Sequence, residues 1–315
     1  MRLSVIVVSW KVPELLRQCL KSLLAQTALP ADDWEVFVVD NFSGDGSVEM
    51  VKEEFPQVRV VANADNRGFA RANNQAFAMC RGRAVLLLNP DTVVLDGAVT
   101  RLLEQLEQNP DWGAAGCQLL NSDRSFQRWT GGALPGLGNV FCNFMLLYRL
   151  LPRQLLPSPI YLEHKPVTNC EVGWVSGACL MLRREALGGH LFDERFFLYG
   201  EDLDLCRRIG SGGWKILYCP AISIMHHEGK SLASMPLEFQ ASKLLGLRKA
   251  FSVDHGPAAL LAYDVVALGG FLLRYLIVFC AASLRLTRME EARQQTLAEY
   301  IRLSFRTLVH RNLAA

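Results

Sequence analysis

A dense cluster of acidic residues past the middle of the chain has the composition needed for proton transfer. Glu201, Asp202 and Asp204 follow an aromatic patch and a glycine, residues 197–200, and lead into a predicted helix. Carboxylates at a helix start are favoured by the helix dipole, which is a purely structural explanation. A carboxylate beside aromatic side chains is also partly desolvated, and its pKa then moves toward the range that a general base needs. The local pattern leaves both interpretations open.

Two further carboxylates come at the ends of predicted strands. Asp91 follows the strand 84–88 within the sequence Asn89-Pro90-Asp91, and Asp40 ends the strand 35–40. Mg²⁺ and Mn²⁺ prefer oxygen ligands and often bridge to substrate phosphates, so Asp91 is a candidate metal ligand. Asp40 is placed to accept a hydrogen bond from a nucleobase or a ribose hydroxyl. Each residue is also an ordinary turn former, and taken singly the turn explanation is at least as good.

An asparagine-rich segment opens another predicted helix. Residues 63–74 hold four asparagines and two arginines around a glycine. Helix N-termini bind phosphate through free backbone amides, and arginine adds a two-pronged contact. Capping by Asn66 explains one asparagine, but Asn73 and Asn74 lie inside the helix, where asparagine is a poor choice. We therefore take Asn66, Arg71 and Asn73 as candidate substrate-binding residues.

Two adjacent histidines follow a predicted strand near the end of the patterned region. Such pairs mark a polar loop more often than a metal site, yet one imidazole can join Asp91 on a divalent cation. We favour His226 because its spacing to Gly229 and Ser231 fits a loop shaped around phosphate. The choice between His226 and His227 stays open at this point.

The elements that must position these side chains alternate between strand and helix over the first 120 residues. The predicted strands are 3–9, 35–40, 58–62 and 84–88, and the predicted helices are 13–26, 48–55, 70–80 and 96–108. This order predicts an α/β fold with a mainly parallel sheet. Ligands of such sheets bind at the carboxyl ends of the strands, so Asp40, Asn66 and Asp91 are expected to share one cleft.

Composition sets the class of protein. The chain has 315 residues, half of them hydrophobic and a fifth charged, which is enough for a sizeable core. A net charge of +2 gives no reason to expect nucleic acid as a partner. The nine cysteines form no CxxC pair, so we expect reduced thiols in a cytoplasmic protein. The first residues have the pattern of a buried strand, not of a signal peptide.

The last 85 or so residues are predicted to be helical, and one stretch is very apolar. Residues 258–286 nearly qualify as a membrane-spanning helix but carry Asp264, Arg274 and Arg285. Three interpretations stay open: a helix in the membrane interface with its arginines snorkelling, a buried packing or dimer helix, and, least favoured, a spanning helix. The arginine-rich helix 288–311 suits an anionic membrane surface or plain solvent. We expect peripheral membrane contact.

Taken in order, these motifs resemble the family 2 glycosyltransferases, and most of all their bacterial rhamnosyltransferase-like branch. The resemblance covers residues 3 to 231 and is specific as an ordered set, although each motif alone is weak. It is carried by residues 7–10, 38–47, 66–74, 88–91, 174–178, 192–204 and 226–231, which include Asp40-Asn41-Phe42-Ser43-Gly44-Asp45-Gly46-Ser47, Asn89-Pro90-Asp91, Trp174-Val175-Ser176-Gly177-Ala178 and Gly200-Glu201-Asp202.

The resemblance implies a GT-A type nucleotide-sugar-binding fold with a mixed, mainly parallel sheet, followed by a C-terminal helical extension. It also implies an inverting transfer from a nucleotide-diphospho-sugar, assisted by Mg²⁺ or Mn²⁺. Asn89-Pro90-Asp91 stands where the family usually has Asp-x-Asp, so the metal would rest mainly on Asp91, with His226 as second ligand. Asp202 would be the catalytic base.

The substrate-binding positions follow from the same resemblance. The base of the donor is expected near Ser9 and Asp40, and its ribose near Asn89. Glu201 is expected to hold the acceptor. The remaining expected contacts line the sugar pocket or the phosphates, and they are Trp174, Ser176, Gly177, Asn66, Arg71 and Asn73.

The resemblance divides the chain into a catalytic domain, 1–231, and a helical, membrane-associated region, 232–315. Within the first, 1–120 would bind the nucleotide and 121–231 the acceptor. The branch indicates dTDP-rhamnose as donor, and the apolar tail indicates a glycan or lipid-linked acceptor in cell-surface polysaccharide synthesis. The expected location is the cytoplasm, at the inner face of the cell membrane.

Two other functions are compatible with a nucleotide-binding fold. A nucleotidyltransferase that makes nucleotide sugars usually opens with a glycine-rich loop and a following lysine, and residues 8–13 contain no glycine. A non-catalytic nucleotide-sugar-binding membrane partner would have lost the acid or the metal ligand, whereas Asp91, Asp202 and His226 are all present. Both alternatives rank below the glycosyltransferase.

Overall fold

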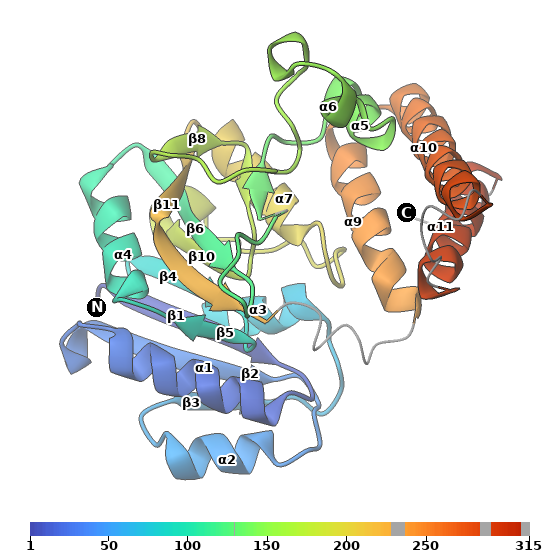
Figure 1. Ribbon diagram of the computed structural model, residues 1–315. Helices are drawn as coiled ribbons and strands as arrows, with labels where there is room; N and C mark the ends of the chain where they lie inside the picture. The colour runs from blue at the N-terminus through green and yellow to red at the C-terminus, as the bar shows by residue number, and fades with distance from the viewer. Residues whose placement is uncertain (129, 228–236, 284–290, 310–315) are drawn as a thin grey trace. The chain divides into compact units, whose positions relative to one another are not determined.

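The computed structural model of the protein describes residues 1–128, 130–227, 237–283 and 291–309 (Figure 1). The chain forms two compact units. We call the first, Met1–Gly132 with Tyr161–Ser234, the sheet unit, and the second, Ala133–Ile160 with Met235–Ala315, the helical unit.

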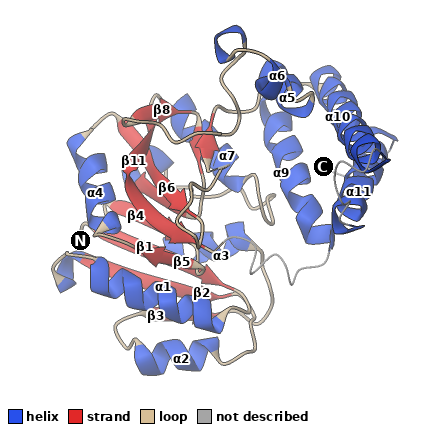
Figure 2. Cartoon of the chain, in the orientation of Figure 1, coloured by secondary structure: helices blue, strands red, loops and turns tan. Residues whose placement is uncertain are grey.

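The sheet unit is built on one large mixed sheet (Figure 2). Over the described residues its strands follow the order β3-β2-β1-β4-β10-β6-β11-β5, with β8 also paired to β11. The bounds are β1 Leu3–Ser9, β2 Trp34–Asp40, β3 Arg59–Ala62, β4 Ala84–Leu88, β5 Thr92–Val94, β6 Trp112–Leu120, β8 Cys170–Val172, β10 Cys179–Arg183 and β11 Lys215–His226.

Four of the eight strand pairs that the structure describes in this sheet are parallel, and the four antiparallel pairs join β10 to β4 and β6, and β5 and β8 to β11. Strands β3, β2, β1 and β4 run parallel, as do β6 and β11, whereas β10 runs antiparallel to β4 and β6 between them. A separate two-stranded ribbon pairs β7, Gly131–Gly132, with β9, Trp174–Val175. The predicted mixed, mainly parallel α/β architecture is confirmed.

Five helices among the described residues belong to the sheet unit, and two short 3₁₀ turns accompany them. The helices are α1 Pro13–Gln26, α2 Ser47–Glu54, α3 Phe69–Phe77, α4 Ala98–Gln108 and α7 Glu201–Ser211, and the turns are η1 Ala31–Asp33 and η3 Arg184–Leu187. Helix α1 begins with a proline, which suits the first helical position because no intrahelical N–H is lost there. Its apolar residues recur at helical spacing and are buried against the sheet.

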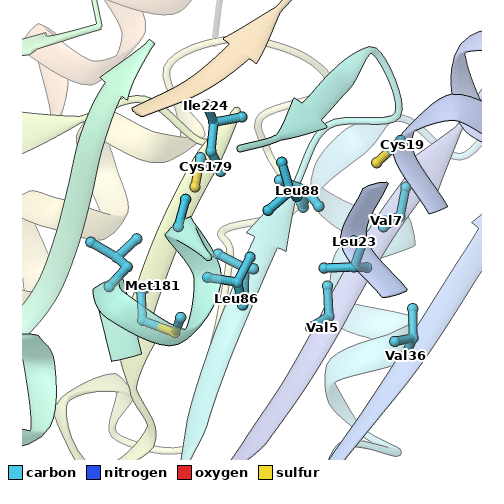
Figure 3. Packing of buried hydrophobic residues seen from close by; sticks show 14 of the residues in the cluster. Val5, Val7, Cys19, Leu23, Val36, Leu86, Leu88, Cys179, Met181 and Ile224 are labelled. Carbon is cyan, nitrogen blue, oxygen red and sulfur yellow. The ribbon is translucent and has the colours of Figure 1, made fainter. Parts of the chain in front are cut away.

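Hydrophobic packing fixes the position of the central strands. Alternate residues of each strand point to the same face of the sheet, and Figure 3 shows them gathered with residues of α1. The labelled members of this buried cluster are Val5, Val7, Cys19, Leu23, Val36, Leu86, Leu88, Cys179, Met181 and Ile224. A shift of one residue in any strand would turn its apolar side chains to the other face, so the register is strongly specified.

That register brings chemistry-bearing residues to one edge of the sheet. Ser9 is aligned with Asp40, and Leu88 is aligned with Cys179. Because β10 runs antiparallel to β4, its first residue lies beside the last residue of β4. The segments that follow β1, β2 and β4 and the segment that precedes β10 therefore meet at one edge.

The helical unit contains α5 Leu137–Phe144, α6 Leu147–Leu150, the turn η2 Arg153–Leu155, α9 Leu237–Asp254, α10 Pro257–Ser283 and α11 Glu291–Val309. Helix α5 packs against α10: Gly270 approaches the Phe144 carbonyl oxygen so closely that an added Cβ would lie 2.7 Å from it. The segment Ala133–Ile160 thus groups with the C-terminal helices. The sequence analysis places this segment within the acceptor half, 121–231. Its grouping with the C-terminal helices depends on contacts between residues far apart in the chain, which no local pattern reveals.

Candidate active site

Three of the predicted site residues meet where β4 and β11 end. His226 Nε2 lies 3.3 Å from Asp91 Oδ1 and 3.4 Å from Asn89 Nδ2. The backbone holds this group together, since His226 pairs with Thr92 of β5 and the amide of His227 donates to the Asp91 carbonyl oxygen at 2.9 Å. Asp91 and His226 are both buried, and Asn89 is half-buried.

A glutamine that the sequence analysis missed orients the His226 ring. Gln127 Nε2 donates to Asn121 Oδ1 and to the carbonyl oxygen of His226, so its Oε1 is left to accept from His226 Nδ1 at 2.7 Å. The proton on Nδ1 leaves the Nε2 lone pair facing Asn89 and Asp91. Hydrogen bonds to the remote nitrogen commonly fix the tautomer of metal-binding histidines in this way.

The neighbouring histidine has a different environment. His227 Nδ1 lies 2.7 Å from Ser122 Oγ. The geometry therefore favours His226 over His227 as a partner of Asp91. Gly229 and Ser231, on whose spacing that preference rested in the sequence, lie outside the described residues.

The donor set at Asp91 and His226 fits a divalent cation that also binds substrate. A carboxylate oxygen and an imidazole lone pair 3.3 Å apart repel each other unless a proton or a cation lies between them. Within the described ranges, no group of three or more His, Cys, Asp or Glu could hold a metal ion. Mg²⁺ in particular is often bound through one or two protein ligands and completed by phosphate oxygens.

A second polar group lies at the ends of β1 and β2. The backbone amide of Ser43 donates to Asp40 Oδ2 at 3.0 Å. In the part of the chain that the structure describes, Asp40 Oδ1 and Ser9 Oγ are buried and have no hydrogen-bond partner. Buried polar atoms without partners are rare in native proteins because they are costly. These two atoms are therefore suited to bind the N–H and C=O groups of a ligand.

Asn66 has an internal role in this structure. Its Oδ1 accepts from Asn41 Nδ2 at 2.8 Å and from the amide of Gly68 at 3.0 Å. Asn41 in turn accepts from Asn63 Nδ2 at 3.1 Å. The side chain of Asn66 therefore ties the segment after β2 to the start of α3, and its contact with substrate stays a prediction.

The other candidates on α3 also contact protein groups. Arg71 Nε lies 3.2 Å from Glu194 Oε2, and Asn73 Nδ2 donates to the Phe69 carbonyl oxygen at 2.9 Å. Asn74 bonds both the amide and the carbonyl of Phe192, which explains an asparagine inside a helix. These contacts of Arg71 and Asn73 do not join them to Asp91 or Asp40, and their substrate roles stay predictions.

Asp202 is held by two backbone amides at the start of α7. The amide of Gly177 donates to its Oδ2 at 3.2 Å, and the amide of Leu203 donates to its Oδ1 at 2.9 Å. The turn before α7 places Tyr199 at φ +67°, a left-handed conformation that is unusual for an aromatic residue. Strained backbone of this kind is concentrated at functional sites.

The starts of α3 and α7 are fastened to each other. The amide of Phe69 donates to the carbonyl oxygen of Phe197 at 2.8 Å. Gly68 has φ +79°, and a Cβ there would lie 2.6 Å from the Phe197 ring, so only glycine fits. This close approach fixes the loop that precedes Glu201 and Asp202.

Burial sets the protonation of the two carboxylates at the start of α7. Burial raises the pKa of Asp202, and the amides of Gly177 and Leu203 oppose that rise. Burial, followed by the nearby charge of Asp202, raises the pKa of Glu201 to about 8. Within the described chain, Glu201 Oε2 has no hydrogen-bond partner. Near neutral pH Glu201 is therefore neutral, and burial increases the proton affinity of Asp202.

The predicted sugar-pocket residues Ser176 and Trp174 differ in how far they are buried. Ser176 is half-buried, and its Oγ accepts from the amide of Ala178 at 3.3 Å. Trp174 is only 5% exposed, and its ring lies 6.0 Å from that of Tyr161 in an edge-on arrangement. Burial and the charge of Asp202 raise the pKa of Tyr161 to about 12. Tyr161, which no sequence pattern singled out, thus lies near Asp202 with Trp174 packed against it.

The metal-ligand candidates and the candidate base are connected through the sheet edge. The amide of Asn89 donates to the carbonyl oxygen of Ala178 at 3.0 Å, and the adjacent amide, Gly177, bonds Asp202. The two acids, 111 positions apart in the sequence, are thereby tied to neighbouring strands at the same edge. The structure thus brings together Ser9, Asp40, Asn89, Asp91, Ser176, Gly177, Asp202 and His226 along one edge.

Comparison with known proteins assigns the class. The family described as Glycosyl transferase family 2 matches residues 4–190. The chain belongs to this family and is an inverting glycosyltransferase, not a nucleotidyltransferase.

Two of the similar proteins are rhamnosyltransferases. The chain is 30% identical over 256 residues to the N-acetylglucosaminyl-diphospho-decaprenol L-rhamnosyltransferase of Mycobacterium tuberculosis (strain ATCC 25618 / H37Rv), which covers 76% of this chain and 80% of that protein. It is 25% identical over 154 residues to the rhamnosyltransferase WbbL of Escherichia coli (strain K12), covering 48% of this chain and 55% of that one. The predicted resemblance to the rhamnosyltransferase-like branch is confirmed.

Solved structures share the fold. The mannosyltransferase PcManGT from Pyrobaculum calidifontis, in complex with GDP-Man and Mn²⁺, superposes with a TM-score of 0.59 at 16% identity, covering 99% of this chain and 88% of that one. GalNAc-T7 with UDP, GalNAc and Mn²⁺ superposes with a TM-score of 0.54 at 16% identity, covering 84% of this chain and 48% of that one. The predicted GT-A type fold is confirmed.

Proposed function

We propose that this enzyme transfers L-rhamnose from dTDP-rhamnose to a hydroxyl of a lipid-linked saccharide during cell-surface polysaccharide synthesis. The relatives named above carry rhamnosyltransferase activity in their names, and one of them is named for a decaprenol-linked acceptor. The observation on which the catalytic assignment depends is the hydrogen-bond link between the Asn89 segment and Asp202 through Gly177 and Ala178.

The donor would lie along the sheet edge. Asp40 Oδ1 and Ser9 Oγ, both buried and without partners among the described residues, would bind the polar edge of the base. Asn89 would bond the ribose. Asp91 and His226 would hold Mg²⁺ or Mn²⁺, which when bound neutralises the diphosphate and so stabilises it as a leaving group. The protein itself keeps His226 Nε2 available through the bond from Nδ1 to Gln127.

Asp202 would remove the proton of the acceptor hydroxyl. As the acceptor oxygen forms its bond to the anomeric carbon, the bond from that carbon to the diphosphate oxygen breaks on the opposite face, and the configuration inverts. The proton passes to Asp202, whose raised pKa strengthens it as a base. A positioned base of this kind contributes about 10²–10⁴-fold to the rate.

The neighbouring groups would position the acceptor. Glu201, neutral near pH 7 because its pKa is about 8, can donate a hydrogen bond where an ionised carboxylate could not. Ser176 and Gly177 would line the sugar pocket, and Trp174 would support it through the Tyr161 ring. The proposal also includes the location, which is the inner face of the cell membrane, where the enzyme would meet a lipid-linked acceptor.

A donor and metal screen tests the proposal. The full chain is incubated with dTDP-rhamnose, UDP-N-acetylglucosamine or GDP-mannose, with Mg²⁺, Mn²⁺ or EDTA, and with a prenyl-diphosphate-linked N-acetylglucosamine acceptor. Of the three donors, we expect only dTDP-rhamnose to support transfer, and only when Mg²⁺ or Mn²⁺ is present. Transfer from another donor would contradict the rhamnose assignment, and full activity in EDTA would contradict the metal site.

A further inference from the structure

An exposed segment of the helical unit combines leucines with arginines. Residues 149–155, which we call the leucine–arginine loop, include Leu150 at 73% exposure and Leu155 at 75%, with Arg149 and Arg153 also exposed. The whole segment 133–160 contains these two arginines and no acidic residue. Large apolar side chains exposed together in a soluble protein indicate an interaction surface.

Helix α10 has an apolar outer face of the same kind. Val265, Leu272, Leu276 and Phe279 are all more than two-fifths exposed and recur at helical spacing, so they lie along one side of the helix. No charged residue of α10 lies on that side. A water-facing helix normally presents polar residues outward, so an exposed apolar face of this kind indicates a surface that binds an apolar partner.

The charged residues of α10 are bound inside the helical unit. Asp264 forms a buried bidentate ion pair with Arg248 at 2.6 and 2.8 Å. Arg274 donates to the carbonyl oxygens of Asn143 and Phe144 in α5. Arg274 thus packs inward and does not snorkel outward, unlike the snorkelling that the interface interpretation of the sequence expects.

These contacts argue against the spanning interpretation of the apolar helix. Residues Pro257–Cys280 are long and apolar enough to cross a membrane by length and composition. A helix that spanned the bilayer would, however, have to carry the Asp264 pair and Arg274 with it, together with the elements that bind them. One buried side and one apolar exposed side are instead the features of a helix that lies along the membrane surface.

Charge complementarity indicates what covers this surface. The helical unit carries twelve Lys and Arg against six Asp and Glu, a net charge of +6. The whole chain has a net charge of +2, which leaves −4 for the sheet unit. A positive module with exposed leucines matches an anionic bilayer, because each basic residue near such a surface adds to binding while the leucines enter the acyl boundary.

We propose that the helical unit docks on the surface of an anionic phospholipid bilayer, with the leucine–arginine loop and the outer face of α10 inserted at the headgroup boundary. Arg149 and Arg153 then contact lipid phosphates while Leu150 and Leu155 enter the apolar layer. This inference deepens the proposed location at a membrane and does not depend on which sugar is transferred.

Vesicle flotation with the purified full chain tests the docking. Vesicles of phosphatidylcholine alone are compared with vesicles containing about 30 mole percent phosphatidylglycerol. We expect tight binding to the anionic vesicles and weak binding to the neutral ones. For the double variant Leu150→Asp/Leu155→Asp we expect at least about tenfold weaker binding, since burying one leucine contributes about that factor. Leu276→Asp in α10 is expected to weaken binding as well.

The controls separate docking from folding and from catalysis. Val167→Asp changes an apolar residue of the sheet unit that is 95% exposed, and it should bind vesicles like the wild type. All variants should melt at the wild-type temperature and transfer sugar normally to a water-soluble acceptor. Vesicle binding by Leu150→Asp/Leu155→Asp equal to the wild type, or burial of these leucines in a stable dimer detected by analytical ultracentrifugation, would overturn the proposal. Failure of sugar transfer with intact vesicle binding would count against the proposed function alone.

Discussion

The backbone amide of Gly177 donates a 3.2 Å hydrogen bond to Oδ2 of Asp202, which lies 25 positions further along the chain. Gly177 stands just before β10, the strand that runs antiparallel between β4 and β6. The same short segment accepts a bond from the amide of Asn89. Through this one junction the proposed base is held next to the segment that carries the proposed metal ligand Asp91.

Replacing Asp202 by asparagine should abolish transfer without weakening donor binding. The change keeps the shape and one of the two bonds from the amides of Gly177 and Leu203, because only the single amide oxygen of asparagine can accept, and it removes the proton acceptor. We expect transfer to fall about 10²–10⁴-fold, with the Kd for dTDP unchanged within about threefold. Steady-state kinetics and calorimetry measure the two quantities. Glu185→Gln, a change of an exposed carboxylate on η3, is the control and should transfer normally. Transfer by Asp202→Asn at the wild-type rate would exclude Asp202 as the base.

Replacing Gln127 by alanine should weaken metal binding although Gln127 is not a proposed ligand. Without the bond to Nδ1, the His226 ring loses its orientation and its tautomer. Loss of such an outer partner typically lowers metal affinity about 10–100-fold. Titration with Mn²⁺ followed by electron paramagnetic resonance measures the affinity. Ser122→Ala removes the partner of His227 and should leave it unchanged, whereas the opposite pattern would identify His227 as the ligand.

Replacing Asp40 by asparagine should weaken binding of dTDP. The buried carboxylate oxygen without a partner would become an amide of different hydrogen-bond pattern, and a charge-assisted hydrogen bond contributes about 1.5–3 kcal/mol. We expect the Kd to rise about 10–100-fold, as measured by calorimetry. Asp45→Asn, an exposed change in the same turn, is the matched control. Equal affinities of the wild type and Asp40→Asn for dTDP would show that the nucleobase of the donor binds elsewhere.

The raised pKa of Glu201 predicts a specific dependence of stability on pH. The unfolded chain ionises this group near its ordinary pKa of 4.5, whereas the folded protein keeps the proton until about pH 8. Between these values the folded state binds more protons, so the free energy of unfolding falls as the pH rises and levels off above pH 8. The loss from this group is on the order of 3 kcal/mol between pH 5 and 8.

Glu201→Gln isolates that contribution. The neutral isostere cannot ionise, so its free energy of unfolding should change less between pH 5 and 8 than that of the wild type. Urea unfolding at both pH values measures the difference. Parallel pH dependences of the two proteins would show that Glu201 is ionised in the folded state.

The parallel half of the fold could be predicted from local pattern. The strands at Leu3–Ser9 and Ala84–Leu88 are nearly continuous apolar runs of strand length. This is the sequence pattern of a strand that is buried on both faces. Helix α1 follows from its apolar spacing and initial proline. The grouping of Ala133–Ile160 with the C-terminal helices was missed, because it depends on contacts such as that of Arg274 with Phe144, 130 positions apart.

Some residues of the candidate site could likewise be predicted from the sequence, and others could not. Carboxylates at strand ends could be found because parallel strands end at a common edge, and Asp40 and Asp91 both lie there. Gln127 and Tyr161 could not, since each acts through a residue distant in sequence; Gln127 bonds His226 across 99 positions. The internal contacts of the α3 asparagines could not be predicted, since Asn74 bonds the backbone of Phe192, 118 positions away.

The central claim is that one site holds both a cation on Asp91 and the base Asp202. Crystals of the full chain grown with Mn²⁺ and dTDP, measured at the manganese absorption edge, test it most directly. The account predicts an anomalous peak about 2.2 Å from Asp91 and His226 Nε2, in contact with the diphosphate, with the Asp202 carboxylate facing the same cavity. A manganese peak away from Asp91, or an Asp202 carboxylate turned away from the bound diphosphate, would contradict it.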